Sequence, residues 1–125
     1  MPSFQPPIRD MAFVLEEVAG LEGIAALPGY EEASPDLVTA VLAEAGRFAA
    51  EVLAPLNPIG DREGCRLENG AVTTAAGFAD AYRQFVDGGW NALPFDPEYG
   101  GQGLPWVVGT RSEEHTSELQ SRFGI

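Results

Sequence analysis

The sequence has no lysine and few basic residues of any kind. Its seven basic residues are all arginine and stand against 19 acidic ones, which gives a formal net charge of −12. The absence of lysine excludes a Walker-type P-loop, which needs one to reach the phosphates. The shortage of positive charge also argues against a nucleic-acid-binding function, because phosphate backbones are bound through a basic surface.

Cysteine and long apolar runs are also scarce. Cys65 is the only cysteine, so an internal disulfide and a Cys-x-x-Cys metal or redox pair are excluded. A reducing cytoplasm is the expected location. The start, Met1-Pro-Ser-Phe-Gln-Pro-Pro, has no apolar leader, and no apolar run reaches the ~18 residues that span a membrane. Neither export nor membrane insertion is expected.

The composition is otherwise that of a folded chain, with 45% hydrophobic and 10% aromatic residues. The spacing of apolar residues predicts an all-α fold. Its helices are expected from an N-cap at Asp10 to Gly20, from Ser34 and Pro35 to about Ala54, and from near Thr74 to Gly88. Pro55 and Pro58 are expected to prevent continuation of the long helix, and Pro105 would suit the first turn of another.

Asn69-Gly70 is a tight-turn signal in an otherwise polar stretch. It could close a small hairpin between residues 65–67 and 71–73, and a bare loop is equally compatible with the sequence.

The last residues differ in character from the rest of the chain. Residues 111–121 resemble the in-frame translation of a common short-read sequencing adapter, so residues 111–125 are interpreted as an artefactual tail and excluded from fold reasoning. The only histidine, His115, lies in this tail. Its neighbours Ser112 and Glu113 therefore receive no weight as partners in nucleophilic chemistry, which needs a fold that fixes their geometry.

Several groups of residues could suggest a site. Gly101-Gln102-Gly103 is not a dinucleotide fingerprint, because Trp106 stands where a further glycine is required and no strand precedes. Gly100, Gly101 and Gly103 are instead expected to permit positive φ in a compact loop. Solvated surfaces are the favoured interpretation of the carboxylate pairs, which are Glu16-Glu17, Glu31-Glu32 and Asp96/Glu98.

Aromatic residues gather near the end of the chain, at Trp90, Phe95, Tyr99 and Trp106. Stacking on a base or a flavin is conceivable, and packing in the core or between domains is the favoured interpretation. No residue is assigned a catalytic, cofactor-binding or metal-binding role from the sequence.

Four blocks, taken in order, resemble the amino-terminal region of an acyl-CoA dehydrogenase, of the larger bacterial type with a short extra arm. They are DMAFVLEEV, ALPGYEEASPDLVTAVLAEAGRFAAEVLAPLN, GDREGCRLENGAVTTAAGF and GGWNALPFDPEYGGQGLP. The likeness covers residues 3–110. Its most specific parts are Gly88-Gly89-Trp90 and the block from Asp96 to Pro105.

The resemblance implies an FAD-dependent enzyme that oxidises the Cα–Cβ bond of acyl-CoA thioesters, as a homo-oligomer. It implies an arm and short helix over residues 1–33 and an incomplete amino-terminal helical domain over 34–110. The segments that hold FAD and the catalytic glutamate would lie downstream, so this chain is expected to be inactive and to bind no FAD. The alternative is a self-sufficient acidic helical module that binds a protein partner through an amphipathic groove.

Overall fold

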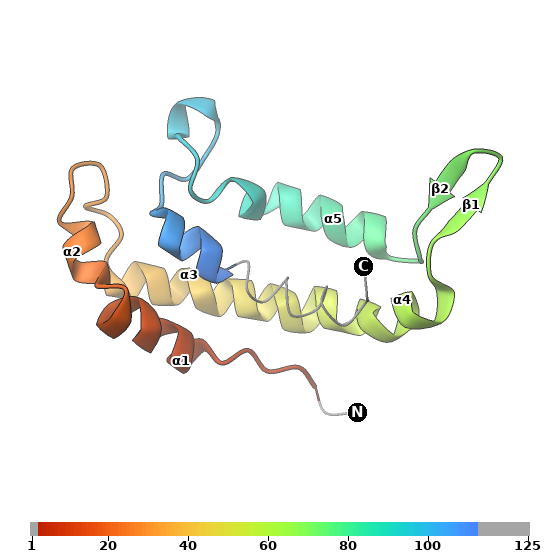
Figure 1. Ribbon diagram of the computed structural model, residues 1–125, viewed down its shortest axis with the longest axis horizontal. Helices are drawn as coiled ribbons and strands as arrows, with labels where there is room; N and C mark the ends of the chain where they lie inside the picture. Colours follow the sequence, from red (N-terminus) through yellow and green to blue (C-terminus); the bar gives the residue numbers. More distant parts are fainter. Residues whose placement is uncertain (1–2, 113–125) are drawn as a thin grey trace.

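The computed structural model describes residues 3–112, so His115 and most of the predicted tail lie outside the described residues. The all-α prediction is confirmed: the described chain is helical apart from one small hairpin and its connecting loops (Figure 1). None of the helices in this part of the chain is long and apolar enough to cross a membrane.

One long helical run forms the axis of the structure (Figure 1). It consists of α3 (Pro35–Phe48), a π-helical turn η2 (Ala49–Leu53), a 3-10 turn η3 (Ala54–Leu56) and α4 (Asn57–Glu63). The predicted start is confirmed, since Ser34 Oγ accepts a hydrogen bond from Leu37 N at 3.2 Å and Pro35 occupies the first turn.

The predicted end of this run near Ala54 is wrong. The chain stays helical to Glu63 because Pro55 and Pro58 fall in the opening positions of η3 and α4. A proline there removes an N–H that would have no partner within its own helix. The run therefore continues as successive short segments and not as one regular helix.

A second layer at one end consists of α1 (Ile8–Phe13), the π-helical turn η1 (Val14–Val18) and α2 (Leu21–Ala25). The predicted helix is present, but it begins at Ile8, so Asp10 lies in the first turn and is not the N-cap. Gly20 ends it at φ 69°, as expected. Helix α2 was not predicted, because it is too short for a helical period to be visible in the sequence.

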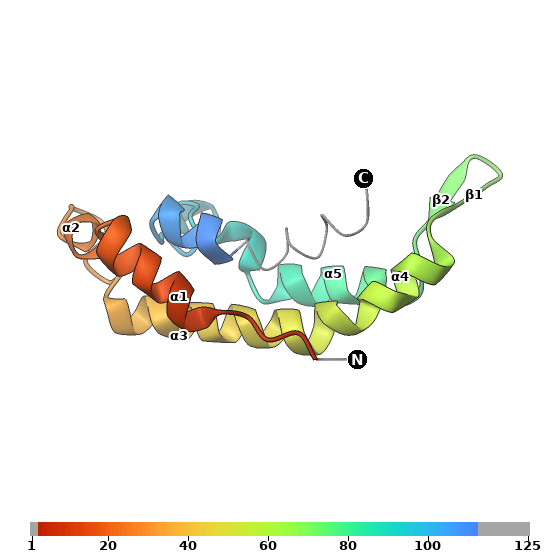
Figure 2. The same cartoon turned by 60° about the horizontal axis from the view of Figure 1, so that its bottom comes forward.

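Of the two alternatives for Asn69-Gly70, the structure forms the hairpin. Strands β1 (Arg66–Glu68) and β2 (Ala71–Thr73) pair antiparallel with Leu67 opposite Val72. Each strand has 3 residues, and all of them are exposed. The hairpin projects from the end of the long helical run (Figures 1 and 2).

The helix after the hairpin, α5 (Phe78–Asp87), runs back alongside the long helical run (Figures 1 and 2). It was predicted to begin near Thr74 and begins instead after Gly77, whose φ of 88° turns the chain into the helix. Ala81 is its only buried residue. The Phe48 and Phe85 rings, 6.3 Å apart, join α5 to the long helical run.

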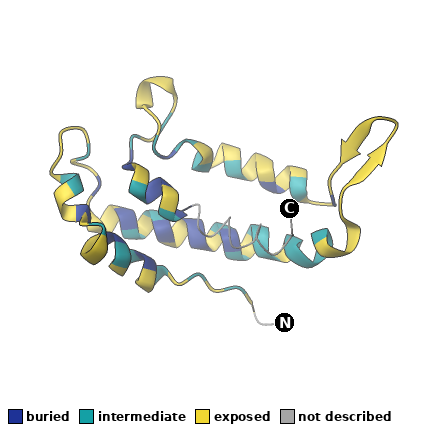
Figure 3. Cartoon of the chain, viewed as in Figure 1, coloured by how far each residue is buried: buried dark blue, intermediate teal, exposed yellow. Residues whose placement is uncertain are grey.

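The hydrophobic core lies at the end of the molecule where α1, α3 and the helical residues 106–112 meet (Figure 3). Its buried members are Met11, Leu15, Leu21, Ala33, Val38, Leu42, Leu93, Leu104 and Val108. Of the described residues between Leu42 and Leu93, only Trp90 packs against this core, and only in part. The half that holds α4, the hairpin and α5 is consequently the more exposed one.

Candidate functional site

The loop between α5 and residues 106–112 carries the most specific sequence motif, and the structure holds it firmly. Two 3-10 turns, η4 (Trp90–Ala92) and η5 (Pro97–Tyr99), are folded together by backbone hydrogen bonds. Gly103 N donates to Phe95 O at 2.9 Å and Leu104 N to Leu93 O at 3.0 Å. Leu93 and Leu104 are both buried in the core, so the two loop segments that this hydrogen bond joins are both packed against the rest of the protein.

Each of the three glycines in the Gly-Gly-x-Gly segment of this loop has a conformational reason to be glycine. Gly100 and Gly103 have φ of 85° and 65°, which confirms the expected positive φ. The same expectation is wrong for Gly101, where the reason is close approach. A Cβ built on Gly101 would lie 2.0 Å from the backbone oxygen of Phe95. The loop glycines therefore serve the fold of the loop itself.

The amides of Gly101, Gln102 and Gly103 are all used within the loop and are not free to bind phosphate. Gly101 N donates to Asp96 O at 3.0 Å and Gln102 N to Ala92 O at 3.1 Å. With Gly103 N also paired across the loop, the Gly-x-Gly segment offers none of the free N–H groups with which phosphate-binding loops hold their ligand. This geometry supports the rejection of a dinucleotide fingerprint at this loop.

The carboxylate of Asp96 is also used by the loop. Asp96 Oδ1 accepts a hydrogen bond from Glu98 N at 2.9 Å and caps η5. Glu98 itself is exposed. Among residues 3–112 no group of three His, Cys, Asp or Glu side chains could hold a metal ion.

The other carboxylate pairs lie at the surface. Glu16, Glu17, Glu31 and Glu32 are all exposed, as the interpretation of solvated faces requires. The backbone N–H groups of Glu31 itself and of Gly29, the latter 3.0 Å from Oε2, lower the pKa of the Glu31 carboxyl. A lowered pKa favours the ionised form and is the opposite of what a general acid needs at neutral pH.

The aromatic residues of the loop divide into two groups. The Trp90 ring stacks on the Phe48 ring, with their centroids 6.5 Å apart, and Trp90 packs against the core. The predicted core packing is therefore confirmed for Trp90. Phe95, Tyr99 and Trp106 are 48%, 84% and 62% exposed, so core packing is wrong for these three in the described chain. Phe95 and Trp106 contact each other edge to face at 5.7 Å. Their packing between domains stays a prediction.

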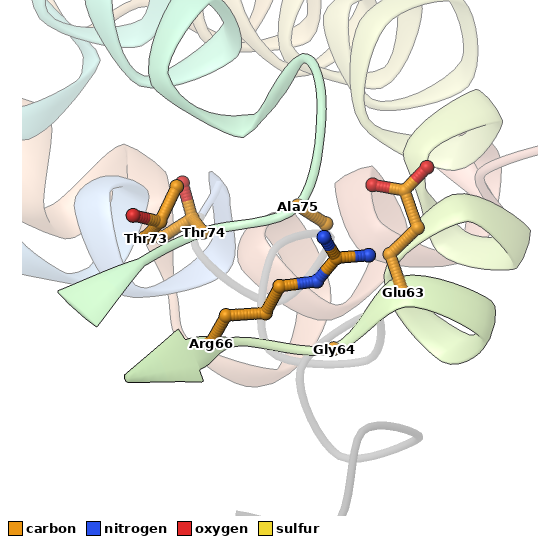
Figure 4. Close-up of a pocket in the computed structure, with 6 residues that line it drawn as sticks. All are labelled: Glu63, Gly64, Arg66, Thr73, Thr74 and Ala75. Carbon is orange, nitrogen blue, oxygen red and sulfur yellow. The ribbon is translucent and has the colours of Figure 1, made fainter. Parts of the chain in front are cut away.

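A hollow of about 220 Å³ at the base of the hairpin was not expected from the sequence. Figure 4 shows its lining residues, which are Glu63, Gly64, Arg66, Thr73, Thr74 and Ala75. The carboxylate of Glu63 already has a partner within the chain, because Glu63 Oε2 accepts a hydrogen bond from Ala76 N at 3.0 Å. This contact joins residues 13 apart in sequence, and no local pattern predicts it.

Comparison with known proteins bears on this loop and on the rest of the chain. No protein-family profile matches the sequence. A curated protein of Ruegeria pomeroyi, 3-methylmercaptopropionyl-CoA dehydrogenase, is 44% identical over 123 residues. The resemblance to the acyl-CoA dehydrogenases is confirmed. The match covers 98% of this chain and 21% of the relative, so the chain spans about a fifth of the length of that acyl-CoA dehydrogenase.

The alignment also bears on the boundary at Thr110. Because it covers 123 of the 125 residues, it runs past Thr110 into residues 111–125. The similarity to the acyl-CoA dehydrogenase therefore does not by itself show that the authentic sequence ends at Thr110. The artefactual origin of residues 111–125 stays a prediction, as does the division into residues 1–33 and 34–110.

Proposed function

We propose that this chain is part of an FAD-dependent acyl-CoA dehydrogenase that oxidises the Cα–Cβ bond of an acyl-CoA thioester. The observation that carries the proposal is the 44% identity over nearly the whole chain to a protein named 3-methylmercaptopropionyl-CoA dehydrogenase. Acyl-CoA as the substrate class, homo-oligomeric assembly and a cytoplasmic location belong to the proposal for the parent protein. The single exposed thiol of Cys65 agrees with a reducing compartment.

The described residues do not fit a flavin site of their own. FAD carries a pyrophosphate, which proteins hold with free backbone N–H groups, helix N-termini or basic side chains. The amides of Gly101, Gln102 and Gly103 are all paired within the loop, and the chain as a whole is strongly acidic. We therefore place the flavin-binding segments and the catalytic glutamate outside this chain.

Within the parent protein, this region would contribute one wall of the enzyme. Phe95, Tyr99 and Trp106 are exposed on a loop that is itself fixed by hydrogen bonds and by two buried leucines. Large exposed aromatic residues on a rigid support are typical of surfaces that another domain or a ligand covers. The loop would then present a preformed apolar surface to the rest of the enzyme.

A flavin titration tests the proposed inactivity. We expect the purified 125-residue chain to leave the fluorescence of added FAD unchanged and to reduce no dye when acyl-CoA is supplied, because it lacks the segments that hold the cofactor. The intact reading frame of the parent protein, purified in parallel, should carry a flavin absorbance spectrum. Saturable FAD binding by the 125-residue chain alone would contradict the proposal.

The alternative function is a self-sufficient acidic module that binds a protein partner, and the presence of a core shared by α1, α3 and residues 106–112 favours it. The two candidates differ in solution behaviour. A region that lacks its neighbouring domains should self-associate through exposed side chains such as Phe95, Tyr82 and Trp106. Sedimentation velocity as a function of concentration separates them, and a compact monomer at all concentrations would favour the module.

A further inference from the structure

The tip of the hairpin holds an asparagine and a glycine in an unusual backbone conformation. Asn69 has φ 51° and Gly70 has φ 77°, and Asn69 is the only described residue other than glycine with a positive φ. Two consecutive positive φ values between paired strands are typical of the two-residue turn that Asn-Gly favours. Both residues are exposed to solvent.

We propose that Asn69 is a site of spontaneous deamidation. The backbone nitrogen of Gly70 attacks Cγ of the Asn69 side chain, a new N–Cγ bond forms, and the Cγ–Nδ2 bond breaks. Ammonia leaves with the proton that Gly70 N gives up, and a five-membered succinimide remains. Water then opens either of the two imide C–N bonds of the ring, which yields aspartate or isoaspartate.

The attacking nitrogen is accessible. Gly70 N–H has no hydrogen-bond acceptor among the described residues. Glycine also has no side chain to shield its nitrogen, and a Cβ built on Gly70 would have no atom within 4 Å, so the surrounding space is open. Neither a hydrogen bond nor steric crowding opposes the attack.

The hairpin is also able to open. Ring closure requires rotation of the Asn69 backbone out of the tight turn. The strands have 3 residues each and are fully exposed, with Leu67 72% and Val72 68% exposed, so little packing opposes the opening. Short two-stranded hairpins are marginally stable, and regions with few buried contacts open at a low free-energy cost.

The two other asparagines of the chain provide internal controls. Asn57 precedes Pro58, which has no N–H and cannot close the ring. Asn91 precedes Ala92, whose N–H donates to Gly89 O at 3.1 Å inside η4 and whose Cβ crowds the nitrogen. Only Asn69 combines an unhindered nitrogen with an exposed turn.

The reaction would alter the hairpin in two ways. It adds one negative charge to a chain that already carries a net −12. Isoaspartate also adds a carbon atom to the backbone between the strands, and a two-residue turn cannot absorb it while Leu67 remains opposite Val72. Loss of strand pairing in the hairpin is therefore expected to follow formation of isoaspartate.

Peptide mapping by mass spectrometry tests the proposal on the full 125-residue chain. The chain is held at mildly alkaline pH, which favours the attacking amide anion, and digested under acidic conditions. We expect the Asn69 peptide to gain the mass of one water and lose that of one ammonia, with isoaspartate among the products. The reaction at Asn69 should be at least about tenfold faster than at Asn91, because glycine leaves its nitrogen unshielded. Equal rates at Asn69 and Asn91 would overturn the proposal.

Two variants separate the contributions of sequence and structure. Gly70→Ala should slow the reaction at Asn69 at least about tenfold, because it shields the nitrogen, and this comparison holds even if the hairpin is lost. Ala92→Gly creates a second Asn-Gly pair inside η4, and its Asn91 should stay slow. An unchanged rate at Asn69 in Gly70→Ala would exclude attack by the Gly70 nitrogen. An Asn91 in Ala92→Gly that reacts as fast as Asn69 would refute the role of the exposed hairpin.

Discussion

Replacement of Gly101 by alanine is expected to disrupt the glycine-rich loop, with a loss of local stability of about 3 kcal/mol or more, because overpacking against backbone cannot be relieved by a rotamer change. The added Cβ would lie 2.0 Å from Phe95 O and 2.7 Å from Phe95 Cβ. The loop must then separate at Phe95, which accepts the hydrogen bond of Gly103 N. Hydrogen exchange at the Gly103 and Leu104 amides should accelerate roughly a hundredfold.

Two other glycines serve as controls for this substitution. Gly100→Ala introduces strain at φ 85° without any clash, and should cost about 1–2 kcal/mol. Gly23→Ala lies in α2, where an added Cβ has no atom within 4 Å, and should be neutral or stabilising by up to about 1 kcal/mol. If Gly101→Ala left exchange in the loop unchanged, the close approach to Phe95 would not be a determinant of the loop.

Leu42→Ala is expected to cost about 2–5 kcal/mol, the range for removing a buried leucine side chain without full collapse of the cavity. Leu42 is 0% exposed and belongs to the core in which α3 packs against α1. Since the stability of small domains is of order 5–15 kcal/mol, this loss is a large part of the total. Amides in the middle of α3 should lose most of their protection from hydrogen exchange.

The matched control for the core substitution is Leu37→Ala in the same helix. Leu37 is 40% exposed and lies outside the core, so we expect a loss of about 1 kcal/mol or less. Circular dichroism and hydrogen exchange on both variants give the comparison. Similar losses for the two leucines would contradict the placement of the core at this face of α3.

The elements with strong local signals could be predicted from the sequence. Ser34-Pro35 specifies the start of α3 through a side-chain cap and a proline that needs no donor, and both act within one turn. Asn69-Gly70 indicates a tight turn through the tolerance of both residues for positive φ, although the sequence left a hairpin and a bare loop equally compatible. These features depend on neighbours in sequence, so a single sequence contains the information that determines them.

The errors arise where the structure depends on features that helical periodicity and short turn motifs do not describe. Continuation of the helical run past Pro55 depends on a π-helical turn and a 3-10 turn, and helical periodicity describes neither. The true role of Gly101 depends on the position of the Phe95 carbonyl. The exposure of Tyr99 and Trp106 depends on which other parts of an enzyme lie against the loop, and no residue of the loop encodes that.

If this chain is part of an acyl-CoA dehydrogenase, the catalytic segments must lie elsewhere in the same reading frame. The most direct test is to amplify and sequence the source genomic DNA across the codon of Thr110, with primers that contain no library adapter. We expect the genomic frame to encode a different sequence in place of residues 111–121 and to continue into a β-domain and a catalytic glutamate. A genomic frame that encodes residues 111–125 and then stops would contradict the account and favour the self-sufficient helical module.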